Sequence, residues 1–231
     1  MNEHDCTDPA VAGRSARRES ERKRERRLQG ARPKSGLAGL IAALFGPSAK
    51  EKRQLAEEKN WATGADGEQL LARSLARRCP EVPLLHDRRM PRSRANIDHI
   101  AVAASGVYVI DAKRYSGTIK VLKPLFGEPK LKIGGRDRTK LLDGLDKQVM
   151  VVQAVLRAVA PDAPVRGCLC FVAPEGVLAD SGLPVLRTLK INGYPLYYPR
   201  RLARRLNRPG RLSPEQAHRI HAELAQRLPT A

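Results

Sequence analysis

The stretch Asn96–Lys113, which reads NIDHIAVAASGVYVIDAK, constrains the fold more than any other part of the chain. Its two halves are rich in β-branched and apolar residues and flank an Ala-Ser-Gly turn signal at 104–106, a pattern typical of an antiparallel hairpin. With the turn centred between 104 and 105, facing residues have numbers that sum to 209. Asp98 then lies opposite Asp111. Because strand side chains alternate, Asp98, Asp111 and Lys113 share one face.

Two facing aspartates repel each other. Directly opposed strand residues have Cβ atoms about 4.5 to 5.5 Å apart, and like charges at that distance destabilise a sheet. A divalent cation would offset the repulsion, and oxygen ligands suit Mg²⁺ or Mn²⁺, because Mg²⁺ keeps several waters and binds through one or two carboxylates. Lys113 could orient the attacking water or stabilise charge on a phosphate. The alternative is two solvated surface aspartates, but both interrupt apolar strands, where an unpaired charge is costly to bury.

The spacing D-x₁₂-D-x-K of Asp98, Asp111 and Lys113 resembles the core motif of the PD-(D/E)XK nucleases. Three further segments accompany it: W-x-x-G-x-x-G-E at 61–68, N-I-D-H-I at 96–100 and a glutamine-bearing helix near Gln148. In this combination, residues 61–172 are similar to the nuclease-related domain (NERD) family. A proline that the generic motif carries before Asp98 is replaced by Ile97. The resemblance implies a restriction-endonuclease-like α/β sandwich and a metal site made by Asp98, Asp111 and Glu68.

Glu68 lies in a helix predicted over residues 65–77. We expect Thr63 as its N-cap and Asp66 at the third position of a capping box. The apolar positions at helical spacing are Leu70, Leu71 and Leu75. Glu68 shares a face with the last two, so its carboxylate can point towards the sheet. The resemblance implies that Glu68 is part of the active site; the alternative is an acid that favours the positive end of the helix dipole.

Gln148 borders the apolar stripe of a second helix, predicted over residues 141–159. The family pattern implies that it reaches the site on the neighbouring strand, and an ordinary surface amide is the alternative. Glu68, Asp98, Asp111, Lys113 and Gln148 are therefore the predicted catalytic residues. No Ser, His and Asp set and no Cys and His set has a spacing that indicates nucleophilic catalysis.

The charge of the chain predicts its partner. Lys and Arg total 43 against 24 Asp and Glu, a net charge of +19, and residues 1–60 contribute 14 basic and 9 acidic side chains. The remainder is thus basic in its own right. A polyanion is the expected partner, because neutralising phosphates releases counterions; we expect nucleic acid, DNA in the first place. The alternative is a solvated basic surface.

The four cysteines lack the spacing of a zinc site, which indicates free thiols and a cytoplasmic protein. Residues 1–60 are predicted to form a basic, largely disordered extension, in which 1–35 is either disordered or a solvated helix without a core. An apolar helix at 37–46 is too short to span a bilayer, which needs about 20 residues. It could dock on the domain, on a partner protein or, peripherally, at a membrane surface.

Residues 61–173 are the predicted nuclease core and 174–231 a C-terminal extension. After the first helix we expect a strand at 82–88, the central hairpin, a second hairpin at 118–133, the helix bearing Gln148 and a strand at 165–172. An edge strand at 185–191, an arginine-rich helix at 199–206 and a helix capped by Ser213, with Pro214 and Gln216 in its first turn, follow. This order predicts an α/β sandwich with a mixed sheet.

The sequence as a whole predicts a metal-dependent nuclease that hydrolyses phosphodiester bonds in nucleic acid. Two other functions stay open. One is a non-catalytic nucleic-acid-binding module on a nuclease fold, although such a module has no reason to keep Asp98, Asp111 and Lys113 together. The other is a membrane-proximal interaction module that uses residues 37–46.

Overall fold

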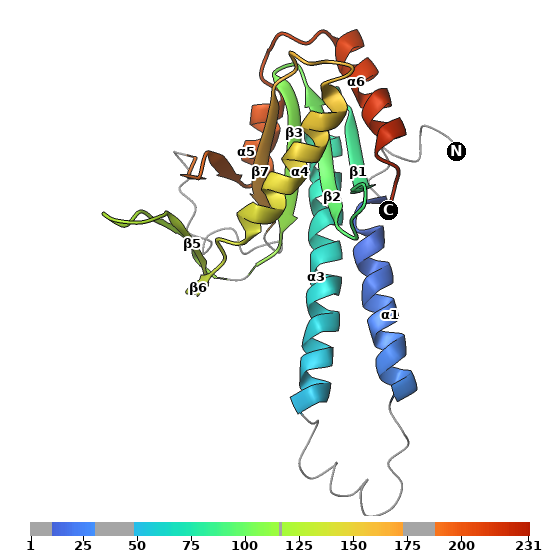
Figure 1. The fold of residues 1–231 in the computed structure, drawn as a ribbon, viewed down its shortest axis with the longest axis vertical. Helices are drawn as coiled ribbons and strands as arrows, with labels where there is room; N and C mark the ends of the chain where they lie inside the picture. The colour runs from blue at the N-terminus through green and yellow to red at the C-terminus, as the bar shows by residue number, and fades with distance from the viewer. Residues whose placement is uncertain (1–10, 31–48, 116, 173–187) are drawn as a thin grey trace, which may run out of the picture.

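The computed structural model describes residues 11–30, 49–115, 117–172 and 188–231 of the chain. A mixed β-sheet lies at its centre, and two long helices and a small hairpin extend from it (Figure 1). The helices are α1 (Arg14–Gly30), α3 (Ala49–Arg78), α4 (Leu141–Leu156), α5 (Pro199–Leu206) and α6 (Pro214–Arg227). The strands are β1 (Leu84–Arg89), β2 (Asn96–Ala103), β3 (Gly106–Lys113), β4 (Ile119–Leu122), β5 (Lys130–Ile133), β6 (Arg136–Asp137), β7 (Val165–Phe171), β8 (Lys190–Ile191) and β9 (Tyr194–Tyr197).

The central sheet has the strand order β1-β2-β3-β7-β9-β8. Its first three strands are antiparallel, β3 pairs with β7 and β7 with β9 in parallel, and β8 is antiparallel to β9. A parallel pair needs a crossover connection, and α4 lies in the one between β3 and β7. The predicted α/β sandwich with a mixed sheet is confirmed, with β3 held by a neighbour on each side.

The register of the central hairpin is the predicted one. The paired residues run from His99 opposite Ile110 to Ala103 opposite Gly106, and the numbers in each pair sum to 209. Gly106 has a φ of +127°, and a Cβ there would lie 2.5 Å from the carbonyl oxygen of Pro164. A glycine is therefore required where the chain turns into β3.

The alternation of side chains divides the core between the two faces of the sheet. One face packs against α4 and α6 and includes Ile100, Val102, Val107 and Val109. The other packs against α3 and α5 and includes Ala101, Ala103, Tyr108 and Ile110. Leu71 and Leu75 of α3 are fully buried, which confirms the predicted docking face of that helix. In α4 the apolar stripe is also buried, at Leu145, Val149, Val152 and Leu156. The helix ends at Leu156 rather than at residue 159, so Val159 of the predicted stripe lies beyond it and is partly buried.

The second hairpin forms a separate small sheet. Residues of β4 pair with β5 from Ile119 opposite Ile133 to Leu122 opposite Lys130, close to the predicted 118–122 and 130–133, and β6 adds a short third strand. It projects from the central sheet at the end where β3 stops (Figure 1). The hairpin is thus an insertion between β3 and α4.

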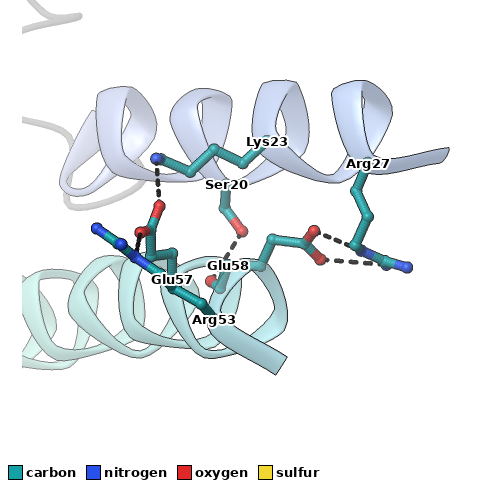
Figure 2. Close-up of polar contacts among 6 residues, drawn as sticks. All are labelled: Ser20, Lys23, Arg27, Arg53, Glu57 and Glu58. Carbon is teal, nitrogen blue, oxygen red and sulfur yellow. Dashed lines mark hydrogen bonds and ion pairs between the residues drawn. The ribbon is translucent and has the colours of Figure 1, made fainter. Parts of the chain in front are cut away.

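Helices α1 and α3 lie side by side and antiparallel, and project well beyond the sheet (Figure 1). We call residues 17–29 and 52–64 the helical arm; none of them is buried. Its cross-helix contacts are polar, as Figure 2 shows. Arg27 donates to both carboxylate oxygens of Glu58 at 2.6 and 3.2 Å, and Lys23 donates to Glu57 at 3.1 Å. Ser20 Oγ donates to the Glu58 carbonyl at 3.3 Å.

Three predictions for the N-terminal part need correction. Helix α3 begins at Ala49, so Thr63 lies inside the helix and is not its N-cap. Residues 14–30 form a helix, which is one of the two predicted alternatives, whereas residues 49–60 are helical rather than disordered, and the proposed boundary at residue 60 falls within α3. Val11, Ala12 and Ala16 are buried, although no core was expected there. The apolar segment at 37–46 lies outside the described residues.

The C-terminal extension follows the sequence closely. Helix α5 has the predicted bounds, and α6 begins with the predicted capping box between Ser213 and Gln216. Of the predicted edge strand, the described part forms β8. Arg88 of β1 is fully buried and its guanidinium donates to the carbonyls of Leu228 and Ala225 and to Thr230 Oγ1. This buried arginine ties the end of α6 to the first strand.

Candidate active site

The C-terminal end of β3 carries the first two site residues. Asp111 is buried among its neighbours, and Lys113, two residues on and on the same face, donates a short hydrogen bond to its carboxylate. Burial opposes the charge of Lys113, but Asp111 and Asp98 outweigh it and raise the pKa of the ammonium. The lysine is therefore a fixed positive charge held at the end of a central strand.

Asp98 lies beside them at the start of β2. The β2–β3 pairs end at His99 and Ile110, and the Asp98 Oδ2 atom accepts a hydrogen bond from the Ala112 N–H at 2.8 Å. The side chain thus takes a main-chain donor that an antiparallel partner would otherwise use. Burial, and then the charges of Glu68 and Asp111, raise the pKa of Asp98 well above its ordinary value. The charges of the two other acids therefore act on Asp98 together with its burial.

Glu68 reaches this region from α3, one turn before Leu71. Its helix lies close to the end of β3: a Cβ on Gly67 would be 3.0 Å from the Cβ of Arg114. Burial raises the pKa of Glu68 to about 8, and the charges of Asp87 and Asp111 act in the same direction. Lys113 and the main-chain N–H of Gly13 act in the opposite direction. The helix therefore adds a third carboxylate to the two on the strands.

One protein family matches the segment that contains these residues. Residues 63–172 match the family model described as the nuclease-related domain. This segment of the chain is a nuclease-related domain. The predicted extent, residues 61–172, agrees with the match, and the family lies within the PD-(D/E)XK-like superfamily. No curated protein and no solved structure matches the chain.

The nuclease-related domain contains one acid that the sequence did not reveal. Asp87 of β1 lies between His86 and Arg88, which pair with His99 and Ile97, so it stands opposite Asp98. Asp87, Asp98 and Asp111 thus occupy corresponding positions on three neighbouring strands. No local pattern marks Asp87, because its backbone is left-handed, with a φ of +50°, and its partner on α1 is 72 residues away.

Asp87 holds the N-terminal segment against the nuclease-related domain. Its carboxylate accepts hydrogen bonds from the Ser15 N–H at 2.8 Å, from Ser15 Oγ at 2.6 Å and from Asn96 Nδ2 at 3.2 Å. An acid that receives main-chain donors at the first turn of a helix stabilises that end of the helix. Next to it, a Cβ on Gly13 would lie 2.6 Å from the Ala65 carbonyl oxygen. The start of α1 therefore closes one side of the site.

Gln148 of α4 lies on the sheet side of its helix and is buried. Its Nε2 atom donates to the Asn96 carbonyl at 3.3 Å, two residues before Asp98. Among the described residues, its buried Oε1 atom has no hydrogen-bond partner. A buried acceptor left without a donor is costly, so this atom calls for a water or ligand at the site.

The carboxylates of the site offer oxygen ligands, the type that a hard divalent cation prefers. In the described parts of the chain, no three His, Cys, Asp or Glu side chains form a ready-made metal cage. Mg²⁺ needs less, because it binds through one or two carboxylates and keeps waters for its other positions. Asp98 and Asp111 supply two carboxylates. Burial, and after it repulsion between the acids, raises the pKa values of Asp98 and Glu68, and a cation would relieve that repulsion.

Two histidines and three cysteines of the described residues are buried near the sheet. His86 and His99 form a buried pair with their Nδ1 atoms 2.8 Å apart. Cys79, Cys168 and Cys170 are free and buried, and burial raises the pKa of each thiol. Across the described residues, no helix is both long enough and apolar enough to cross a membrane.

Proposed function

We propose that the nuclease-related domain is a metal-dependent nuclease that hydrolyses phosphodiester bonds in nucleic acid, with DNA as the expected substrate. The observation that carries this proposal is the meeting of Asp98, Asp111 and Lys113 at adjoining strand ends. The net charge of +19 supports a polyanionic substrate.

Each side chain has a role that follows from its place. Asp98 and Asp111, with Glu68, would hold Mg²⁺ or Mn²⁺. When bound, such an ion polarises the phosphate and lowers the pKa of a water. Lys113 stabilises the negative charge that develops on the phosphate, because it is already fixed and needs no reorganisation. Gln148 uses its Oε1 atom to accept a hydrogen bond from water and orient it.

The test is cleavage of plasmid, linear duplex and single-stranded DNA with Mg²⁺, Mn²⁺ or EDTA. The Lys113→Ala and Asp111→Ala proteins are assayed beside Lys190→Ala, which removes an exposed lysine on the far edge strand β8. We expect metal-dependent cleavage by the wild type and by Lys190→Ala. Removing a fixed stabilising charge should slow the Lys113 variant by about 10² to 10³-fold, with folding checked by circular dichroism.

Two results would contradict the proposal. A folded Lys113→Ala protein that cut at the wild-type rate would remove the mechanism. Binding of DNA without cleavage under every metal condition would favour the non-catalytic binding module instead. Replacing DNA by RNA in the same assay decides between the two nucleic acids.

A further inference from the structure

The tip of the β4–β5 hairpin exposes large apolar side chains. Leu125 and Phe126 are 91% and 87% exposed, and Leu122 is 45% exposed. At the base of the same hairpin, Ile119 and Leu131 are buried. The hairpin therefore has a covered base and an apolar tip, here called the hairpin tip (residues 122–126), that stands in solvent. Apolar groups gathered at one exposed point mark an interaction site more often than isolated ones do.

Lysines surround the hairpin tip. Between residues 120 and 132 the sequence contains four lysines and a single acid, Glu128. Lys120, Lys123 and Lys130 are exposed, whereas Lys132 lies 3.5 Å from Asp137 of β6. Pro124 and Pro129 bracket the exposed loop, and each fixes one backbone angle. This charge is complementary to a polyanion, and the restricted loop loses little conformational entropy on binding.

The hairpin is close in sequence to the candidate active site. Its first strand is separated from Lys113 by five residues, and the chain continues through β6 to α4, the helix of Gln148. The Arg138 guanidinium lies 5.1 Å from the centre of the Tyr115 ring, and the Leu131 N–H donates to Thr139 Oγ1 at 3.0 Å. A substrate in contact with the hairpin tip would therefore be held in a set position relative to Asp111 and Lys113.

We propose that the hairpin tip is a wedge that inserts Leu125 and Phe126 between base steps of duplex DNA. The inference rests on the proposed function, because it assigns the nuclease its substrate form. Apolar residues next to basic ones act in this way in proteins that unstack and kink a duplex. The lysines contact the phosphates on either side, which carries affinity but no sequence preference. Kinking the duplex would expose its phosphodiester backbone beside β3, the strand that carries Asp111 and Lys113.

The test uses a duplex that carries 2-aminopurine, whose fluorescence rises when it is unstacked, with EDTA present so that no strand is cut. The wild type is compared with the double variant Leu125→Ser and Phe126→Ser, with Phe126→Trp, and with Met150→Ser. Met150 is the matched control, since it is 66% exposed on α4. We expect a rise in fluorescence with the wild type, Phe126→Trp and Met150→Ser. The double variant should lose the rise and bind about tenfold more weakly.

The lysines give a second, independent readout. The triple variant Lys120→Ala, Lys123→Ala and Lys130→Ala should weaken binding of every duplex. The slope of log affinity against log salt should fall by about 0.9 for each phosphate that a lysine no longer neutralises. The double variant at the hairpin tip should keep the wild-type slope, because it removes no charge. A double variant with a reduced slope and unchanged 2-aminopurine fluorescence would overturn the assignment of these roles.

Failure of the wedge and failure of the nuclease are distinguishable. If the wild type cuts DNA and the double variant binds, unstacks and cuts equally well, the wedge is wrong and the nuclease stands. If the wild type binds no DNA at all, both are wrong. Flotation with vesicles of phosphatidylserine and phosphatidylcholine tests the other occupant. Vesicle binding that disappears in the double variant, with DNA binding unchanged, would assign the hairpin tip to a membrane and overturn the wedge.

Discussion

The two halves of α3 are one continuous helix held by two different kinds of contact. The half after Gly64 buries Leu71 and Leu75 against the sheet, and Ala65 is buried beside Gly13. The half before it belongs to the helical arm, where Leu55 and Trp61 are 42% and 43% exposed and the partner α1 is held by ion pairs and a hydrogen bond (Figure 2). Both halves are helical, but they contribute unequally to the stability of the fold. Burying apolar side chains contributes far more to the free energy of unfolding than ion pairs near the surface.

Shortening one leucine in each half should separate the two halves most clearly. Leu71→Ala leaves a cavity in the core and should lower the free energy of unfolding by about 2 to 5 kcal/mol. Leu55→Ala, on the same helix, should change it by less than about 0.5 kcal/mol, as at other exposed sites. Urea unfolding followed by circular dichroism measures both. Equal losses in the two variants would show that the arm is as well packed as the domain.

Three buried groups of the domain should make its stability depend on pH, whereas the helical arm contains no histidine and no buried carboxylate. Protonation of Glu68 and Asp98 stabilises the folded state in acid, and His99 acts in the opposite direction. Burial, together with His86, lowers the pKa of His99 well below 6.5, so the folded state keeps the ring neutral. The unfolded chain takes up a proton below pH 6.5, and this contribution to stability is therefore complete above that pH and lost as the pH falls. For one such group the loss between pH 6.5 and 5.5 is about 1 kcal/mol.

Urea unfolding of wild type and His99→Gln at the two pH values isolates this contribution as the difference between the two proteins. His99→Gln should lose about 1 kcal/mol less stability than wild type on acidification, whereas His218→Gln, at an exposed position on α6, should behave as wild type. The helical arm contains no histidine, so hydrogen exchange of its amides, corrected for the intrinsic pH dependence, should not change. Equal changes in wild type and His99→Gln between the two pH values would show that His99 does not contribute.

Two glycines mark the junction of the halves. A Cβ on Gly64 would meet nothing within 4 Å, so Gly64→Ala should stabilise α3 by about 0.5 to 1 kcal/mol. A Cβ on Gly67 would lie 3.0 Å from Arg114 Cβ, next to Lys113, so Gly67→Ala should bring no such gain. Thermal unfolding of the two variants measures the difference. A gain from Gly67→Ala as large as that from Gly64→Ala would show that α3 does not press on the end of β3.

An ion pair of the arm should give the weakest response. Glu58→Gln weakens the contact with Arg27 and should lower the protection of α1 amides by about 0.5 kcal/mol in hydrogen exchange. The exposed Glu25 supplies the control variant Glu25→Gln. Raising NaCl from about 50 mM to about 1 M should reduce this difference only in part, because the Arg27 and Glu58 side chains are mostly buried and salt screens such a pair less than an exposed one. Equal protection in Glu58→Gln and wild type at low salt would mean that this pair does not hold the arm.

The sequence predicted those elements whose signals are local. The hairpin register followed from one turn and two apolar strands, and the capping box of α6 from Ser213, Pro214 and Gln216. The first half of α3 was missed because it has no apolar stripe. Its partners on α1 are more than 30 residues away, and nothing in the local pattern indicates that pairing. The apolar stripe begins only after Thr63, so the pattern predicts Thr63 as the start of the helix.

The residues of the candidate site also fall into those that local patterns predict and those that they do not. Asp98, Asp111 and Lys113 could be placed together because strand geometry fixes which residues face each other, and Glu68 because it lies one turn from a docking leucine. Asp87 could not be found, since its position depends on the loop between β1 and β2 and on Ser15. Whether these acids bind a metal stays a prediction.

The continuity of α3 has a mechanical consequence. From Ala49 to Glu68 the helix axis is about 28 Å long, since each residue adds about 1.5 Å. Glu68 lies where this rod reaches the sheet, and Leu71 and Leu75 bury the end beyond it. A tilt of the rod would displace these packed side chains together with the arm. The packing of the domain therefore sets the direction in which the arm projects.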